Sequence, residues 1–233
     1  MDKRFWIILI VIVLVFGGIF IASNNGKNGN SNSSTTSTPT NHLEGQDKDK
    51  VTLVEYGDYQ CPYCGEYAPV VSQIATAYAP YITFQFRNLP LTSLHPNAFA
   101  GARAAEAASL MGKFWQMHDI LYQENGDYYA SNETAASWIS STSPLTYFDA
   151  FAKQLDLNVN TFNTDYASSA VNNSINSDVA AFAKTGAEEA TPTFFLNGKQ
   201  IQPADAFSDF QTDINAAIKA AGFSVPVVTA PSS

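Results

Sequence analysis

Two cysteines, Cys61 and Cys64, are the only ones in the 233-residue chain, and a proline and a tyrosine separate them. Cysteines this close together cannot staple distant parts of a chain, because so short a ring closes little chain entropy. They are also too few for a four-cysteine zinc site. The fold must therefore rest on a hydrophobic core, for which an apolar content of 45% is sufficient.

The sequence around the pair alternates between strand and helix patterns. Apolar and β-branched runs bounded by turn residues predict four strands, at 51–56, 82–86, 193–196 and 199–201. Helical periodicity lies between these strands and after the last one. Strands separated by helices predict an α/β domain over 51–223 with a helical insertion over about 92–186. Residues 224–233 include two prolines and are expected to form a flexible tail.

The position of the cysteine pair predicts redox chemistry. Cys61 follows the first strand and opens a helix, where free N–H groups and the positive end of the helix dipole stabilise a thiolate. Pro62 suits the first helical turn and stiffens the pair. Cys64 lies one turn further along, close enough to attack a mixed disulfide on Cys61. Cys61 is therefore expected to be the nucleophile and Cys64 the resolving thiol.

Two alternatives for the pair involve no redox activity. Half of a zinc site is one, but its other ligands would have to come from His42, His95 and His118. Of these, His42 lies in a polar linker and His118 on an apolar helical face. An inert structural disulfide is the other, although it would stabilise the fold little. We therefore expect no metal site.

Two segments together carry a family resemblance. They are Val-Glu-Tyr-Gly-Asp-Tyr-Gln-Cys61-Pro-Tyr-Cys64 and Ala190-Thr191-Pro192-Thr193-Phe-Phe-Leu-Asn-Gly198. Over about 51–222 the chain resembles the DsbA-like branch of the thioredoxin superfamily. The resemblance implies a thioredoxin fold with a helical insertion. It also implies a protein thiol–disulfide oxidoreductase whose redox-active disulfide, Cys61–Cys64, takes the place of a cofactor.

The resemblance also implies roles for individual residues. Pro192, preceded by Thr191, matches the proline that is cis in this family and helps to hold an extended substrate segment beside the cysteines. Pro62 and Tyr63 are expected to take part in the same contact. Tyr63 stands where the strongest oxidants of the family carry histidine.

Glu55 matches a position where the family often has a buried acid beneath the active site. A buried carboxyl has a raised pKa and can exchange a proton with Cys64. The alternative is an acid that faces solvent from an edge strand. His95, followed by Pro96, is interpreted as a structural residue in a turn.

The first fifty residues predict export. Phe5 to Ala22 is an uncharged run preceded by Lys3 and Arg4, and at about 1.5 Å per residue it can cross a hydrocarbon core. The basic flank predicts a cytoplasmic N-terminus. We expect residues 1–22 to be an uncleaved single-pass anchor, with a cleaved signal peptide as the alternative. Polar residues dominate 23–50, which predicts a disordered linker.

Charge and export narrow the function. A formal net charge of -9 argues against nucleic-acid binding. Disulfides persist outside the cytoplasm, so an extracytoplasmic domain favours disulfide formation in exported proteins with free thiols. A membrane redox partner would then have to reoxidise the pair. The alternatives are a disulfide reductase or isomerase of the same fold, and a non-enzymatic module that binds extended peptides.

Overall fold

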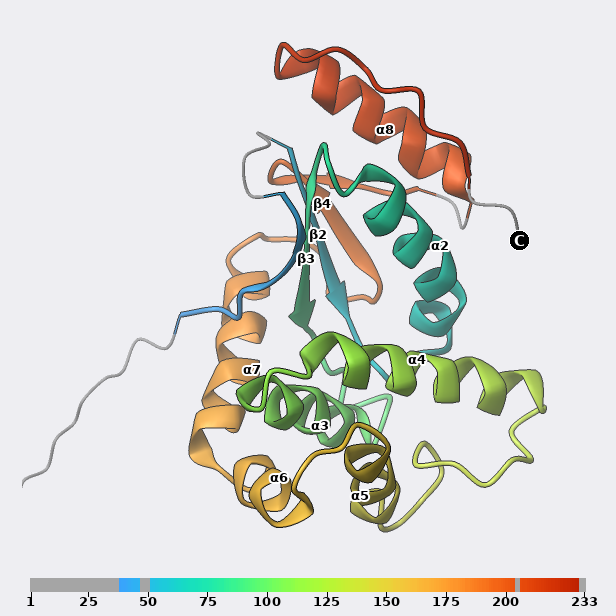
Figure 1. Ribbon diagram of the computed structural model, residues 1–233, viewed down its shortest axis with the longest axis vertical. Helices are drawn as coiled ribbons and strands as arrows, with labels where there is room; N and C mark the ends of the chain where they lie inside the picture. The colour runs from blue at the N-terminus through green and yellow to red at the C-terminus, as the bar shows by residue number, and fades with distance from the viewer. Residues whose placement is uncertain (1–37, 47–50, 204–205, 231–233) are drawn as a thin grey trace, which may run out of the picture. The chain divides into compact units, whose positions relative to one another are not determined.

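The computed structural model describes residues 38–46, 51–203 and 206–230. Strands in this part of the chain form a five-stranded sheet in the order β1-β3-β2-β4-β5 (Figure 1). The strands are β1 (His42–Gly45), β2 (Thr52–Gly57), β3 (Thr83–Asn88), β4 (Thr193–Leu196) and β5 (Lys199–Ile201). β2 and β3 are parallel, and the remaining neighbours are antiparallel. All four strands predicted from the sequence are confirmed to within two residues.

Helices surround this sheet. They are α2 (Pro62–Tyr78), α3 (Ala98–Leu110), α4 (Phe114–Ala130), α5 (Leu145–Gln154), α6 (Val159–Tyr166), α7 (Ser169–Ala183) and α8 (Phe207–Ala220). α2 is the crossover between the parallel strands β2 and β3. Helices α3 to α7 lie between β3 and β4 in the chain, in agreement with the predicted helical insertion. Helices α3 to α6 lie beyond the carboxyl ends of β2 and β3 (Figure 1).

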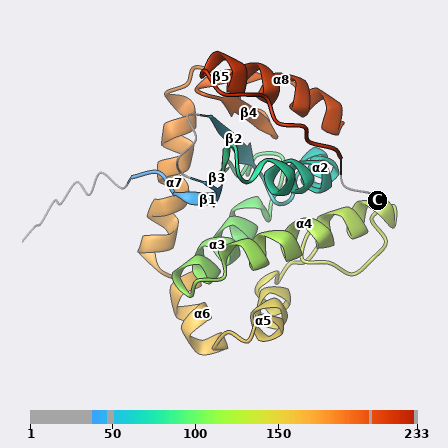
Figure 2. The ribbon, with the colours of Figure 1, turned by 45° about the horizontal axis from the view of Figure 1, so that its top comes forward.

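Side chains alternate along β2 between the two faces of the sheet. Leu53 packs in one apolar cluster with residues of α2 and α8, whereas Tyr56 packs in another with Phe182 of α7. α7 and α2 accordingly lie on opposite sides of the sheet (Figures 1 and 2). Because successive strand side chains point to opposite faces, Glu55 shares the face of Leu53. β2 thus places the Glu55 side chain on the face of the sheet that α2 covers.

The insertion builds a core that continues into the cysteine motif. Small residues make one face of α3 flat, since Ala104, Ala105 and Ala108 are buried, and α4 packs closely against them. The same apolar cluster contains Cys61 and Cys64. The helical insertion therefore forms one wall of the cysteine site.

Strand β1 corrects the predicted linker, because residues 42–45 fall within 23–50. They pair with the edge of β3, from His42 opposite Phe86 to Gly45 opposite Thr83. The His42 ring stacks on Phe114 with centroids 3.4 Å apart, and its Nε2 lies 2.7 Å from Glu106 of α3. Composition alone could not reveal this strand, because its partners come from distant parts of the chain.

The sequence also predicted a membrane anchor at the N-terminal end of the chain and a flexible tail at the C-terminal end. No helix among residues 38–46, 51–203 and 206–230 is long and apolar enough to cross a membrane. The predicted anchor, and the linker up to residue 37, lie outside the described residues. Within the tail predicted to be flexible, Val228 packs partly buried against the α2–α8 cluster, and its carbonyl accepts a hydrogen bond from Gln211 at 2.6 Å.

Candidate active site

Cys61 caps the amino end of α2. It has extended backbone angles (φ -67°, ψ 126°), Pro62 follows in the first turn, and the Gly65 N–H donates to the Cys61 carbonyl at 3.2 Å. Both cysteines are free thiols in this structure. Cys61 is 4% exposed and Cys64 is fully buried. Cys61 therefore keeps a small exposure to solvent that Cys64 lacks, and the roles of nucleophile and resolving thiol stay predictions.

The two thiols have opposite acidities. A hydrogen bond from the Cys64 side chain lowers the pKa of Cys61 to about 6, assisted by the Thr191 side chain and opposed by burial and by Asp58. Burial raises the pKa of Cys64 well above its usual range, and the proximity of Cys61 and Glu55 raises it further. At neutral pH, Cys61 is therefore a thiolate and Cys64 a thiol.

The Thr191–Pro192 peptide bond is cis, as the family resemblance implied, and it lies against Cys61. The Cys61 Sγ is 3.4 Å from the Thr191 carbonyl oxygen. A groove of about 310 Å³ runs beside this contact, lined by Tyr63, Glu188, Pro192 and Phe194 among others. The Tyr63 side chain is 63% exposed. The groove thus brings together Tyr63, Thr191 and Pro192, three of the four residues expected to contact substrate, whereas Pro62 is not among the residues that line it.

Glu55 is buried, with 2% of its surface exposed, so the solvent-facing alternative is wrong. Burial raises the pKa of Glu55 to about 8. Its Oε1 has no hydrogen-bond partner among the described residues. Glu55 also interacts electrostatically with Cys64. A neutral carboxyl beside the inner thiol can exchange a proton with it.

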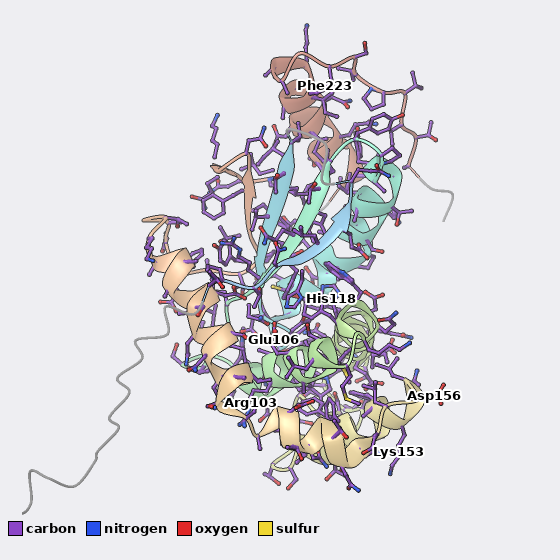
Figure 3. The ribbon with its side chains drawn as sticks, turned by 60° about the vertical axis from the view of Figure 1, so that its left-hand side comes forward. Arg103, Glu106, His118, Lys153, Asp156 and Phe223 are labelled. Carbon is purple, nitrogen blue, oxygen red and sulfur yellow. The ribbon has the colours of Figure 1, made fainter. Side chains whose placement is uncertain are left out.

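A cavity of about 570 Å³ between α2 and α4 reaches Glu55. His118 and Tyr122 of α4 also line it. Figure 3 shows His118 between α4 and the sheet, and burial lowers its pKa. Sequence reasoning placed His118 correctly on an apolar helical face but missed its position at the cavity beside Glu55.

Asn125 of α4 fixes the cysteine loop. Its Nδ2 donates to the carbonyl oxygens of Tyr59 at 2.9 Å and Cys61 at 3.1 Å. Gly65 permits this approach, because a Cβ at that position would collide with the Asn125 amide. The sequence contains no local signal for this residue, since 64 positions separate Asn125 from Cys61.

Asp58 and His95 form a contact next to the cysteine motif that the sequence did not predict. Asp58 Oδ2 lies 2.7 Å from His95 Nδ1, and the Asp58 carbonyl accepts the Cys61 N–H at 3.1 Å. The hydrogen bond to Asp58 raises the pKa of His95, and negative charge on Cys61 raises it as well. The signal in the sequence was weak: an aspartate in the turn before the cysteines and a histidine in a Leu-His-Pro segment.

This arrangement is a thioredoxin-type thiol site: an acidic outer cysteine at a helix start, a buried inner cysteine, and a cis proline beside them. A family model described as Thioredoxin matches residues 37–216. The chain belongs to the thioredoxin family.

Solved structures share the fold. BdbD from Bacillus subtilis, in its oxidised form, has a TM-score of 0.64 and 22% identity, covering 78% of this chain and 96% of that one. A thioredoxin-like oxidoreductase from Silicibacter pomeroyi DSS-3 has a TM-score of 0.62 and 24% identity, covering 79% of this chain and 95% of that one. Alpha-DsbA1 from Wolbachia pipientis has a TM-score of 0.62 and 18% identity, covering 78% of this chain and 93% of that one. The thioredoxin fold implied by the resemblance is thereby confirmed, and one of these neighbours is named as an oxidoreductase, the class expected from the sequence.

Some curated proteins are more similar in sequence to this chain than the solved structures above, and they are named as Na(+)/H(+) antiporters. The Na(+)/H(+) antiporter NhaA 1 of Salinispora arenicola is 36% identical over 159 residues, which are 68% of this chain and 22% of that protein. The protein of the same name from Mycolicibacterium gilvum is 33% identical over 168 residues, 72% of this chain and 25% of that protein. The chain matches about a quarter or less of the length of these relatives.

Proposed function

We propose that the protein is an extracytoplasmic thiol–disulfide oxidoreductase that forms disulfides in exported proteins through Cys61 and Cys64. The observation that carries this proposal is the asymmetry of the pair, with a pKa of about 6 at Cys61 and a raised pKa at the buried Cys64. A low pKa stabilises the reduced form as a thiolate, and a stabilised reduced form makes the disulfide an oxidant.

The proposed cycle begins with the Cys61–Cys64 disulfide. A substrate thiolate attacks the Cys61 Sγ, the disulfide breaks, and Cys64 leaves as a thiolate that takes a proton from Glu55. The second substrate thiolate then attacks the substrate sulfur of the mixed disulfide, and Cys61 leaves as a thiolate. The substrate has lost two electrons as its disulfide forms, and the cysteine pair has gained them. The low pKa of Cys61 makes it a good leaving group in the second step.

The groove beside Pro192 supports a role in holding the substrate. It lies next to the Cys61–Thr191 contact and presents the exposed ring of Tyr63. An extended segment with a cysteine can lie there with its sulfur facing Cys61. A non-enzymatic peptide-binding module would use the same groove, so Cys61→Ser with Cys64→Ser separates the two functions: a binding module keeps its activity and an oxidoreductase loses it.

The proposal includes a membrane anchor at residues 1–22 and a membrane partner that accepts the electrons. It rests on the uncharged run Phe5–Ala22 and its basic flank. Protease added to intact spheroplasts should digest the domain but leave a membrane-embedded fragment. Release into the soluble fraction of a shortened chain that lacks the N-terminal segment would instead indicate a cleaved signal peptide.

The reduction potential of the pair tests the direction of electron flow. The full-length protein in detergent is equilibrated in glutathione buffers, and the fractions of thiol and disulfide are measured. A disulfide-forming enzyme should give a value of about -120 to -180 mV. A value of about -270 mV would make the protein a reductase and the membrane partner an electron donor. A pair that does not exchange would exclude both enzymes.

A further inference from the structure

His95 and Asp58 form a hydrogen-bonded pair next to the nucleophile. Their side chains meet at 2.7 Å between Asp58 Oδ2 and His95 Nδ1, with Asp58 fully buried and His95 17% exposed. Asp58 belongs to the turn between β2 and α2, and its carbonyl binds the Cys61 N–H. His95 comes from the loop before α3. A second element therefore brings a histidine to the start of α2.

The pair is held rigidly from both sides. Asp58 Oδ1 accepts the Gln60 N–H at 2.8 Å, and Oδ2 accepts the Leu91 N–H at 3.0 Å in addition to His95. The His95 N–H in turn donates to the Leu91 carbonyl at 2.9 Å. These bonds fix the orientation of the Asp58 carboxylate.

A fixed carboxylate at this position opposes the chemistry of Cys61. The titratable groups that interact with Cys61 are Cys64 of α2, Asp58 before α2, His95 before α3 and Tyr129 of α4. Asp58 acts against a thiolate by repulsion. Among these groups of the described chain, His95 alone can carry a positive charge. Tyr63, between the cysteines, offers none.

We propose that His95, held by Asp58, is a positioning residue whose positive charge neutralises the Asp58 carboxylate and keeps Cys61 ionised. This inference rests on the proposed redox function of the pair. It gives Asp58 and His95 a joint role: Asp58 fixes the loop and the imidazole, and His95 removes the electrostatic cost of placing an acid beside the nucleophile.

The first experiment compares His95→Gln, His95→Lys and His42→Gln in the full-length protein in detergent. His95→Gln keeps a donor for Asp58 without a charge, and His95→Lys restores the charge. His42→Gln is the matched control, because His42 also bonds to a buried carboxylate at 2.7 Å, that of Glu106. The readouts are the pH midpoint of Cys61 alkylation and the reduction potential.

In His95→Gln the alkylation midpoint should rise by about one pH unit, the lower end of the effect of a neighbouring opposite charge. From a starting value of about 6, this rise would change the equilibrium constant for exchange with glutathione at pH 7 about fivefold in favour of the disulfide. The reduction potential of the pair would then be about 20 mV more negative. His95→Lys and His42→Gln should keep the wild-type midpoint. An unchanged midpoint in His95→Gln, or an equal rise in His42→Gln, would overturn the proposal.

Reciprocal coupling gives a second test that needs no substitution. If His95 stabilises the thiolate, the thiolate must stabilise the imidazolium by the same free energy. The pKa of His95, followed by NMR titration of its ring, should be higher in the reduced protein than in the disulfide form. Equal His95 values in the two redox states would contradict the proposal even if the pair exchanged disulfides normally. Failure to exchange at all would instead remove the proposed function.

Discussion

The Sγ of Cys61 lies 3.4 Å from the carbonyl oxygen of Thr191, a residue 130 positions further along the chain. This carbonyl can accept the proton of a Cys61 thiol but cannot stabilise a thiolate. The Thr191 side chain has the opposite effect, because it lowers the pKa of Cys61. Thr191 therefore acts on both protonation states of the nucleophile through two different polar groups.

Thr191→Val should weaken the protein as an oxidant. Valine has nearly the same shape and keeps the backbone carbonyl, but it lacks the hydroxyl that favours the thiolate. The Thr191 Oγ1 has no partner at hydrogen-bond distance among the described residues, so its removal should raise the Cys61 pKa by less than the roughly one unit that a full hydrogen bond to a charged group would give. Thiolate absorbance during a pH titration measures this shift. Thr193→Val is the control, since its hydroxyl bonds to the Ala190 carbonyl at 2.7 Å. Equal shifts in the two variants would remove the specific role of Thr191.

Alkylation should distinguish the two thiols of the reduced protein. Cys61 should react with a midpoint of about pH 6, because its thiolate is stabilised there. Cys64 is buried and its pKa is raised, so it should stay unlabelled until the protein unfolds. Mass spectrometry of the labelled peptides, after brief exposure to iodoacetamide at pH 6, identifies the modified residue. Labelling of Cys64 before Cys61 would reverse the assigned roles.

Glu55→Gln should make the stability of the disulfide form less dependent on pH. In the folded protein the Glu55 pKa is about 8, above its unfolded value of 4.5, so folding retains a proton between these pH values. Stability from this group is therefore fully present below pH 4.5 and is lost as the pH rises toward 8. At pH 7 the loss is on the order of 3 kcal/mol.

The variant has no such proton to lose, and its melting temperature relative to the wild type should rise between pH 5 and 8. Substitution of Glu66, an exposed acid on α2, by Gln is the control and should leave the pH profile of stability unchanged.

Single-turnover kinetics of Glu55→Gln test the proton exchange with Cys64. Formation of the mixed disulfide should slow in Glu55→Gln, because the departing Cys64 thiolate then has no carboxyl to protonate it, and an unchanged rate would exclude Glu55 from the mechanism.

The sequence was sufficient for the elements that carry local signals. The strand before Cys61 and the Asn197–Gly198 hairpin follow from residue patterns, and the position of Pro192 follows from a motif. The sequence was insufficient where long-range partners decide. β1 reads as a polar linker because its stability comes from β3, Phe114 and Glu106.

The same limit applies to the site. Asp58 and His95 are 37 positions apart and carry no joint pattern, yet the fold brings them within 2.7 Å. Asn125 reaches the cysteine loop from the middle of the insertion. In contrast, the burial of Glu55 was expected from the family resemblance, and strand alternation accounts for it, since Glu55 shares the face of the buried Leu53. Local periodicity predicts burial, but it does not predict which distant side chain becomes the partner.

Gly65→Ala tests whether close contact between α2 and α4 maintains the site. A methyl group at this position collides with the Asn125 amide, which holds the Tyr59 and Cys61 carbonyls. Overpacking of this kind costs about 1–3 kcal/mol, and we expect a lower urea midpoint together with slower thiol exchange. Gly126→Ala on α4 is the matched control, because a Cβ there meets no atom within 4 Å. It should leave activity intact and stabilise the helix by about 0.5–1 kcal/mol.

Adding Asn125→Ala to Gly65→Ala should recover part of the lost stability, because it removes the clash. The exchange rate should not recover, because the double variant also lacks the two hydrogen bonds from Asn125 to the cysteine loop. Full recovery of both would show that Asn125 does not order the active site.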